Sequence, residues 1–167
     1  VIAARDALGN ETTMTYTAGG LVKTETNPRG VTTTHTYDGF GQLDTAQTEG
    51  YPAVDRDFDP IGRLQSLTDR GGATTAFAYD PRGKVTKRTD PQGRSETKTY
   101  DAAGRLVSET DRNGDTVTMS YTATDKIDGI TYPDGAEVTF DYDARDQLVA
   151  MTDRLGRKGM LIFGLLG

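Results

Sequence analysis

Apolar side chains alternate with hydroxyl-bearing and charged ones in short segments, and this pattern returns every 21 residues. The aromatic residues that mark the period are Tyr16, Tyr37, Phe58, Tyr79, Tyr100, Tyr121, Tyr142 and Phe163. The sixth residue after the aromatic is aliphatic in every copy that reaches it, at Val22, Leu43, Leu64, Val85, Leu106, Ile127 and Leu148. A fixed period of this length predicts an array of small supersecondary units that stack on their neighbours.

Two glycines punctuate each period and predict tight turns. The first follows the aromatic residue by four positions, at Gly20, Gly41, Gly62, Gly83, Gly104 and Gly167, and Asp125 and Asp146 replace it in two repeats. The second glycine is found at Gly9, Gly30, Gly72, Gly93, Gly114, Gly135 and Gly156. The segment Asp80-Pro81-Arg82-Gly83 is typical: Asp accepts main-chain N–H bonds, Pro sets φ near the type I value, and Gly tolerates positive φ.

The segments between the turns are only six and seven residues long and rich in β-branched side chains, which predicts strands and leaves no room for a helix. In residues 116–121 the alternation places three apolar side chains on one face: Val117, Met119 and Tyr121. In the shorter strand, Leu106 and Ser108 are expected to share a face, with Arg105 and Val107 on the other. The sequence therefore predicts an all-β fold of antiparallel β-hairpin repeats of 21 residues, forming a curved, spiralling single-layer sheet.

The repeats predict one continuous array over residues 1–167, which we interpret as a fragment of a larger protein. The repeats start near residues 16, 37, 58, 79, 100, 121 and 142, and a partial eighth starts at residue 163. An irregular connection is expected at residues 47–57, where the glycine comes one position early and Pro52 removes a main-chain donor. Four consecutive apolar residues at 160–163 would lie on a strand edge and predict self-association of the isolated chain.

The composition excludes several classes of function. Hydrophobic residues make up only 34% of the chain, which is little for a thick core. The chain has no cysteine, so disulfides, thiolate metal sites and cysteine nucleophiles are excluded. A net charge of -6 argues against nucleic acid as a partner, and the apolar end of the chain is shorter than the roughly 20 residues of a membrane span.

Candidate catalytic and metal-binding residues are few, and a structural interpretation is favoured for each. His35 is the only imidazole and stands where other repeats carry Met or Phe. Asp111, Asn113 and Asp115 alternate like the start of a calcium loop, but Thr116 stands where such a loop needs Gly. The other carboxylates recur at turns, where they cap the main chain. We therefore predict a non-enzymatic chain with no catalytic, cofactor-binding or metal-binding residues and no cofactor.

Two interpretations of the aromatic column are open. Equivalent residues of neighbouring repeats come into lateral register in a sheet, where aromatic pairs stabilise each other by about 0.2–1 kcal/mol. Exposed tyrosines along a sheet could instead stack on sugar rings. The packing ladder is favoured, and a carbohydrate-binding surface is the alternative.

The unit that begins Tyr100-Asp101-Ala102-Ala103-Gly104-Arg105-Leu106 resembles the tyrosine-aspartate (YD) repeat of the Rhs, or rearrangement hot spot, family. The resemblance covers nearly the whole chain, although Tyr16 and Tyr121 are followed by Thr in place of Asp. It implies a secreted or injected polymorphic toxin in which such hairpins spiral into a shell that encapsulates a C-terminal toxin. The implied partners are the remaining repeats and the toxin domain of the parent chain. The repeat region of teneurin adhesion receptors is similar, so an adhesion or carbohydrate-binding module is the alternative function.

Overall fold

The computed structural model describes residues 1–160, and within them the chain forms sixteen β-strands and no helix. All strand pairs are antiparallel and join neighbours in the sequence, so the predicted all-β antiparallel fold is confirmed. The chain divides into two compact units, the first ending at Gly93 and the second beginning at Arg94. The expected partial eighth repeat at Phe163, and all of the apolar run 160–163 except Met160, lie outside the described residues.

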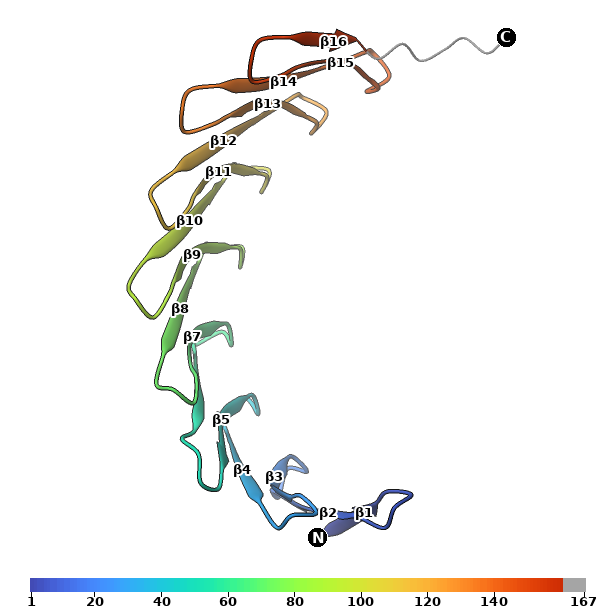
Figure 1. Cartoon of the computed structure of the whole chain (residues 1–167), viewed down its shortest axis with the longest axis vertical. Coiled ribbons are helices and arrows are strands. Elements are labelled where there is room, and N and C mark those ends of the chain that lie inside the picture. The colour runs from blue at the N-terminus through green and yellow to red at the C-terminus, as the bar shows by residue number, and fades with distance from the viewer. Residues whose placement is uncertain (161–167) are drawn as a thin grey trace, which may run out of the picture. The chain divides into compact units, whose positions relative to one another are not determined.

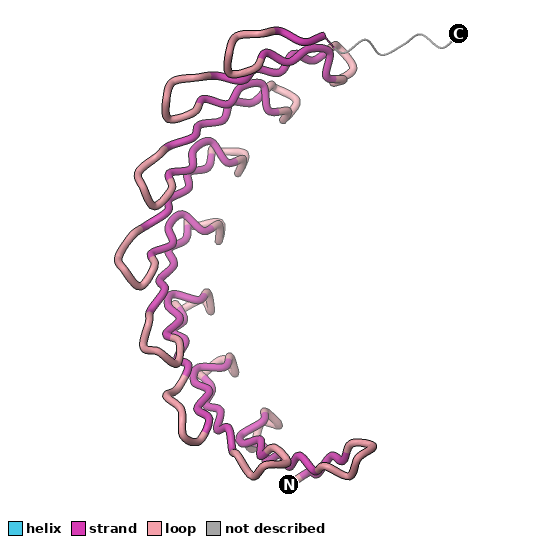
Figure 2. Tube along the Cα trace, viewed as in Figure 1, coloured by secondary structure: helices cyan, strands magenta, loops and turns pink. Residues whose placement is uncertain are grey.

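The first unit is an open meander of nine strands (Figures 1 and 2). Its strands are β1 (Ile2–Arg5), β2 (Glu11–Tyr16), β3 (Val22–Thr26), β4 (Thr32–Tyr37), β5 (Leu43–Thr48), β6 (Val54–Phe58), β7 (Leu64–Thr68), β8 (Thr74–Tyr79) and β9 (Val85–Thr89). The second unit continues with β10 (Ser95–Tyr100), β11 (Leu106–Thr110), β12 (Thr116–Tyr121), β13 (Ile127–Thr131), β14 (Glu137–Tyr142), β15 (Leu148–Thr152) and β16 (Lys158–Met160). Within each unit, successive hairpins are rotated relative to one another, so the sheet is curved (Figure 1).

The turns have the hydrogen bonds that their sequences predict. At Asp80 the carboxylate Oδ1 accepts the main-chain N–H of Arg82 at 2.9 Å and that of Lys84 at 2.8 Å. The main-chain N–H of Gly83 donates to the Asp80 carbonyl at 3.0 Å. Gly83 has φ of +84°, and Asp146, which replaces glycine in a later repeat, adopts the same left-handed region with φ of +59°.

Replacing Gly83 with Val should therefore lower the free energy of unfolding by about 1–3 kcal/mol, because a β-branched residue resists positive φ. A Cβ atom at Gly83 would have no atom within 4 Å, so the effect is confined to the main chain. Gly39 is the matched control, because it also has open space around it but does not have positive φ. Denaturant unfolding should show a lower midpoint for Gly83→Val than for Gly39→Val, and equal midpoints would contradict the prediction.

A β-bulge follows the aromatic residue in each hairpin of this type and corrects one expectation from the sequence. Thr99 pairs with Ser108, but the next residue, Tyr100, pairs with Leu106, so Val107 is an extra residue. Thr99 and Tyr100 are consecutive in the strand, so their side chains point to opposite faces of the sheet. Their partners Ser108 and Leu106 therefore also lie on opposite faces. The expectation that Leu106 and Ser108 share a face is wrong, because simple alternation takes no account of the inserted residue.

The repeat is interrupted between β5 and β6, at the stretch expected to be irregular. Only two pairs join these strands, Thr45 with Asp55 and Ala46 with Val54. In the connection, the main-chain N–H of Tyr51 closes a turn on the Thr48 carbonyl at 3.0 Å. The early glycine and Pro52 thus shorten the strand pairing without ending the sheet.

Both units contain few fully buried residues. Among residues 1–160, Ala150 is the one fully buried apolar residue, with 3% of its surface exposed. Most strand residues are half-buried, as expected where a sheet has neighbours along its length but no second layer. The stability of each unit therefore comes mainly from contacts between adjacent repeats. Residues 1–160 contain no helix that could span a membrane.

Candidate functional site

Tyrosines of the aromatic column link several repeats to the one before them. Hydroxyls of this column donate to the main-chain carbonyl of the aliphatic signature residue fifteen positions earlier, as in Tyr37 to Val22 (2.6 Å), Tyr79 to Leu64 (2.8 Å), Tyr121 to Leu106 (2.6 Å) and Tyr142 to Ile127 (2.8 Å). These four side chains are half-buried. Each tyrosine thus fills a gap between repeats and satisfies a carbonyl at the bulge, where the regular strand pairing is disturbed.

Arginine at the fifth position after the aromatic residue adds a second link, which reaches forward. In the first unit, Arg63 Nε donates to Asp59 Oδ2 at 2.6 Å, and Arg63 Nη1 donates to the Asp80 carbonyl of the next turn at 2.9 Å. The guanidinium carbon lies 4.8 Å from the centre of the Tyr79 ring. Arg63 therefore joins its own turn to both the turn and the tyrosine of the following repeat.

Arg105 repeats this arrangement in the second unit. Its guanidinium lies 2.7 Å from Asp101 Oδ2 and 2.6 Å from Asp125 Oδ1, and its carbon lies 4.6 Å from the centre of the Tyr121 ring. The hydrogen bond to Asp101 raises the pKa of the Arg105 guanidinium. The sequence assigned Arg105 only to a strand face, so this inter-repeat role is a finding of the structure.

Replacing Arg105 with Ala should lower the thermal midpoint, because its contacts with Asp125, the Tyr121 ring and the Thr122 carbonyl of the next repeat are lost together. Arg105→Lys is the matched control, since Lys occupies the equivalent position at Lys84 and Lys126. A lysine keeps one charge but cannot reproduce the planar fork that reaches both carboxylates. Circular dichroism melts should therefore rank native above Lys above Ala, and a native-like midpoint for the Ala variant would show that the contacts contribute nothing.

Three turn carboxylates have a pKa below the usual value, which favours their ionised form. The main-chain N–H of Arg63 bonded to its carboxylate lowers the pKa of Asp59 despite burial, and the N–H of Arg105 does the same to the pKa of Asp101. The side-chain hydrogen bond from Arg157 lowers the pKa of Asp153. Several turns of the chain therefore depend on charged aspartates.

Acid should consequently weaken the fold. A carboxyl whose folded pKa lies below its unfolded pKa stabilises the protein fully above the unfolded value of 3.8, and this contribution is lost as pH falls through the folded pKa. We expect the thermal midpoint to be level near neutral pH and to fall below about pH 4. Asp101→Asn should flatten part of that fall, because the amide does not titrate, and an equally steep fall would argue against Asp101 as a contributor.

The opposite edge of the sheet carries arginines that reach backward. Arg70 lies over the ring of Tyr51 at 5.5 Å and donates to Thr48 Oγ1 at 3.0 Å. Arg154 lies 4.1 Å from the centre of the Tyr132 ring and bonds Asp134. Cross-repeat links are therefore present at both turn edges, although the partners differ from repeat to repeat.

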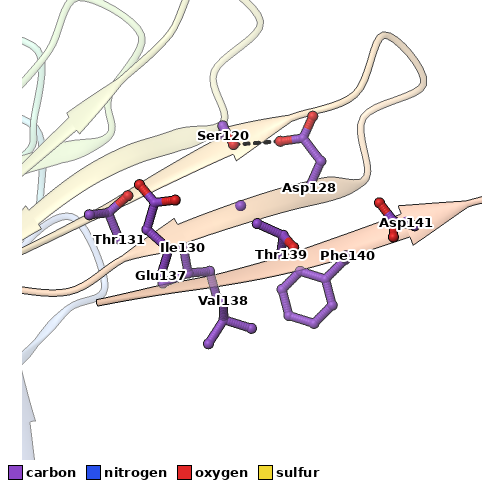
Figure 3. A pocket seen from close by; sticks show the side chains of 10 residues that line it. Ser120, Asp128, Ile130, Thr131, Glu137, Val138, Thr139, Phe140 and Asp141 are labelled. Carbon is purple, nitrogen blue, oxygen red and sulfur yellow. Dashed lines mark hydrogen bonds between the residues drawn. The ribbon is translucent and has the colours of Figure 1, made fainter. Parts of the chain in front are cut away.

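A shallow hollow of about 440 Å³ lies on one face of the second unit (Figure 3). Ser120 Oγ donates to Asp128 Oδ1 at 2.5 Å beside it, and Val138 and Phe140 are among the other residues that line it (Figure 3). Gly129 leaves the space open, since a Cβ atom there would lie 2.6 Å from Ser120 Oγ. The face is polar and acidic, and within residues 1–160 no group of three His, Cys, Asp or Glu side chains could hold a metal ion.

The structure does not assemble the other candidate residues into a reactive site. His35 lies in β4 opposite Ala46 and is half-buried. Asp111 Oδ1 accepts the main-chain N–H groups of Asn113 and Asp115 at 2.8 and 3.0 Å, which closes an ordinary turn. The Asp111 carboxylate therefore caps the main chain of its own turn. The oxygen atoms that alternate in the sequence do not converge on one point as cation ligands would.

Sequence reasoning missed the arginine links and the acceptor of each tyrosine hydroxyl. The signal for the first was present, since Arg63 and Arg105 stand at the same position of their repeats, next to a turn aspartate. The second has no sequence signal, because the acceptor is a main-chain carbonyl. Within residues 1–160, the 21-residue signature residues lie at the turns and at the strand ends that meet at the bulge.

An open antiparallel sheet of 21-residue hairpins, linked by tyrosine and arginine side chains, defines a β-hairpin repeat protein. The teneurin YD-shell family model matches residues 73–153, and the RHS repeat model matches residues 18–52. The chain belongs to the Rhs/YD-repeat family.

Solved structures with this fold include the Photorhabdus luminescens Tc holotoxin pore, at 16% identity and a TM-score of 0.58 over 86% of this chain. The complex TcdB2-TccC3-Cdc42 matches 85% of the chain at 17% identity and a TM-score of 0.59. TcdB2-TccC3 without its hypervariable C-terminal region matches 84% at 17% identity and a TM-score of 0.59. The chain spans only 9% of the length of each of these proteins. No curated protein sequence matches it significantly.

Proposed function

We propose that this chain is a non-enzymatic wall segment of an Rhs-type toxin shell, which encapsulates a C-terminal toxin in the parent protein. The observation that supports the proposal is that polar side chains of the sheet form hydrogen bonds to neighbouring repeats. The tyrosine hydroxyls bond carbonyls of the preceding repeat, and Arg63 and Arg105 bond the following one. Side chains that link one repeat to the next serve continuity of the sheet, which is what a wall requires.

The likeness to Tc toxin proteins supports the same proposal. In the parent, further 21-residue repeats would continue the sheet and its curvature into a spiral, and residues 1–167 would form one continuous array within it. The parent would be secreted or injected, and the partners of this segment would be the neighbouring repeats and the toxin domain. The aromatic, glycine and aliphatic positions of the repeat signature would be the residues that each further repeat needs in order to pair with the one before it.

Protease protection in the full-length protein tests the proposal. If these repeats wall off a C-terminal domain, that domain should resist a protease in the native protein and be cut at the usual rate once it is expressed alone. Deleting residues 58–99, two whole repeats, should open the wall and expose the domain without changing its own sequence. A C-terminal domain that is cut equally fast in the native and deleted proteins would contradict encapsulation.

A surface adhesion or carbohydrate-binding role is the second candidate. Two aromatic side chains outside the tyrosine column favour it, since Phe40 is 74% exposed and Tyr51 is 57% exposed. Glycan-array binding that is lost in Phe40→Ala or Tyr51→Ala, with the thermal midpoint retained, would support this role. An array without a bound glycan would leave the wall as the preferred function.

A further inference from the structure

The turn between β11 and β12 contains a chemically reactive pair that the proposed function does not use. Asn113 is followed by Gly114, whereas the other two asparagines of the chain precede a Glu and a Pro. An asparagine side chain cyclises when the main-chain nitrogen of the next residue attacks its amide carbon. Proline has no N–H for this step, and a side chain larger than hydrogen on the next residue hinders it.

The geometry of the turn leaves this attack accessible. Asn113 and Gly114 are both exposed, and a Cβ atom at Gly114 would have nothing within 4 Å. The Gly114 N–H makes one hydrogen bond, to the Asp111 carbonyl at 3.1 Å, at a tip that water reaches freely. The Asn113 amide is held by one bond of 3.3 Å from Nδ2 to Asp111 Oδ2. Opening of these two contacts frees both reacting groups.

We propose that Asn113 is a site of spontaneous deamidation, with water as the co-reactant. The Gly114 nitrogen gives its proton to a solvent base and forms a bond to Asn113 Cγ. The bond from Cγ to Nδ2 then breaks, and ammonia leaves with a proton from solvent, which leaves a five-membered succinimide. Water opens this ring at either carbonyl and yields aspartate or isoaspartate, with no oxidation or reduction at any step.

The product changes the turn in two ways. It places a third negative charge between Asp111 and Asp115, which adds repulsion at this edge of the sheet. Isoaspartate also inserts a methylene group into the main chain, so the Gly114 N–H no longer meets the Asp111 carbonyl in register. The hairpin whose last pair is Thr110 with Thr116 is therefore the place where the ageing chain loosens first.

The equivalent turn of the next repeat provides an internal comparison. Asp134 also precedes a glycine, Gly135, and an uncharged aspartate could form the same ring by losing water. Asp134 Oδ2, however, bonds the Arg154 guanidinium at 2.7 Å, and the Ala136 N–H bonded to its carboxylate lowers its pKa. An ionised, paired carboxylate is a poor electrophile, so Asp134 should stay unmodified.

Peptide mapping by mass spectrometry tests the proposal on the folded chain after prolonged incubation at neutral and mildly alkaline pH. The peptide with Asn113 should convert to aspartate and isoaspartate forms, faster at the higher pH and several-fold more than the peptides with Asn10 and Asn27. Asn113→Gln should abolish most of the ammonia released. Conversion at Asn113 no greater than at Asn10, or ammonia release unchanged in Asn113→Gln, would overturn the proposal. Incubation in denaturant should accelerate the reaction, which would show that opening of the turn limits it.

Discussion

Replacing Leu106 with Asp should lower the free energy of unfolding by about 2–4 kcal/mol, because a carboxylate would replace a half-buried aliphatic side chain at a repeat interface. Leu106 lies opposite Tyr100, and its carbonyl accepts the Tyr121 hydroxyl at 2.6 Å. Hydration of an aspartate at this point would pull the strand end away from both tyrosines. Denaturant unfolding followed by circular dichroism measures the loss.

The next residue offers a matched control at the same bulge. Val107→Asp should have a small effect, since aspartate occupies the equivalent position at Asp44 and Asp128. Asp128 accepts the Ser120 hydroxyl, and Thr99 could donate to a new aspartate at 107 in the same way. A loss of stability at Val107 as large as that at Leu106 would contradict the prediction that the repeat interface depends on Leu106 in particular.

A deletion of one whole repeat of 21 residues should be tolerated far better than a deletion of 20 residues at the same place. Removal of residues 121–141 joins Ser120 to Tyr142 and keeps the period of 21. The shortened chain should keep its β-sheet signal and melt at a lower temperature, because one repeat interface is lost. Removal of 121–140 joins Ser120 to Asp141, so the following strand is out of phase by one residue.

The second deletion should lose most of the β-sheet signal of the second unit. A slip of one residue turns every side chain of a strand to the other face and misplaces the tyrosine that bonds the preceding carbonyl. Far-UV circular dichroism and sedimentation of the two deletion variants, compared at equal concentration, measure the difference. Equal stability of the two variants would mean that the 21-residue phase does not govern the pairing of the strands.

The turns and strands were predictable because their causes are local. Asp80, Pro81 and Gly83 set hydrogen bonds and φ values within four residues, and the structure has a turn at that place. The alternation in residues 116–121 likewise matches β12, in which neighbouring side chains point to opposite faces. Even the irregular connection at residues 47–57 had a local cause, the displaced glycine and Pro52.

The bulge was not predictable from the alternation of side chains. Because the bulge was missed, Leu106 and Ser108 were assigned to the same face of the sheet. Val107 carries no signal that distinguishes it from an ordinary strand residue, yet it is the residue left without a partner opposite Tyr100. Arg105, which the sequence placed beside it on a strand face, binds Asp101 and Asp125 at two turns. The contact with Asp125 joins residues 20 positions apart, and a pattern within one strand carries no signal for it.

The sequence by itself determined the 21-residue period, the turns, the strands and the antiparallel order, because each depends on main-chain preferences over a few residues. The tertiary structure alone decided which residue forms the bulge, which carbonyl receives each tyrosine hydroxyl, and which turns the arginines connect. These contacts depend on the spacing of neighbouring strands and on side chains that reach across it, so they exist only once two repeats lie side by side. Features that depend on interactions within one hairpin were predictable from the sequence. Features that depend on interactions between hairpins were visible only in the tertiary structure.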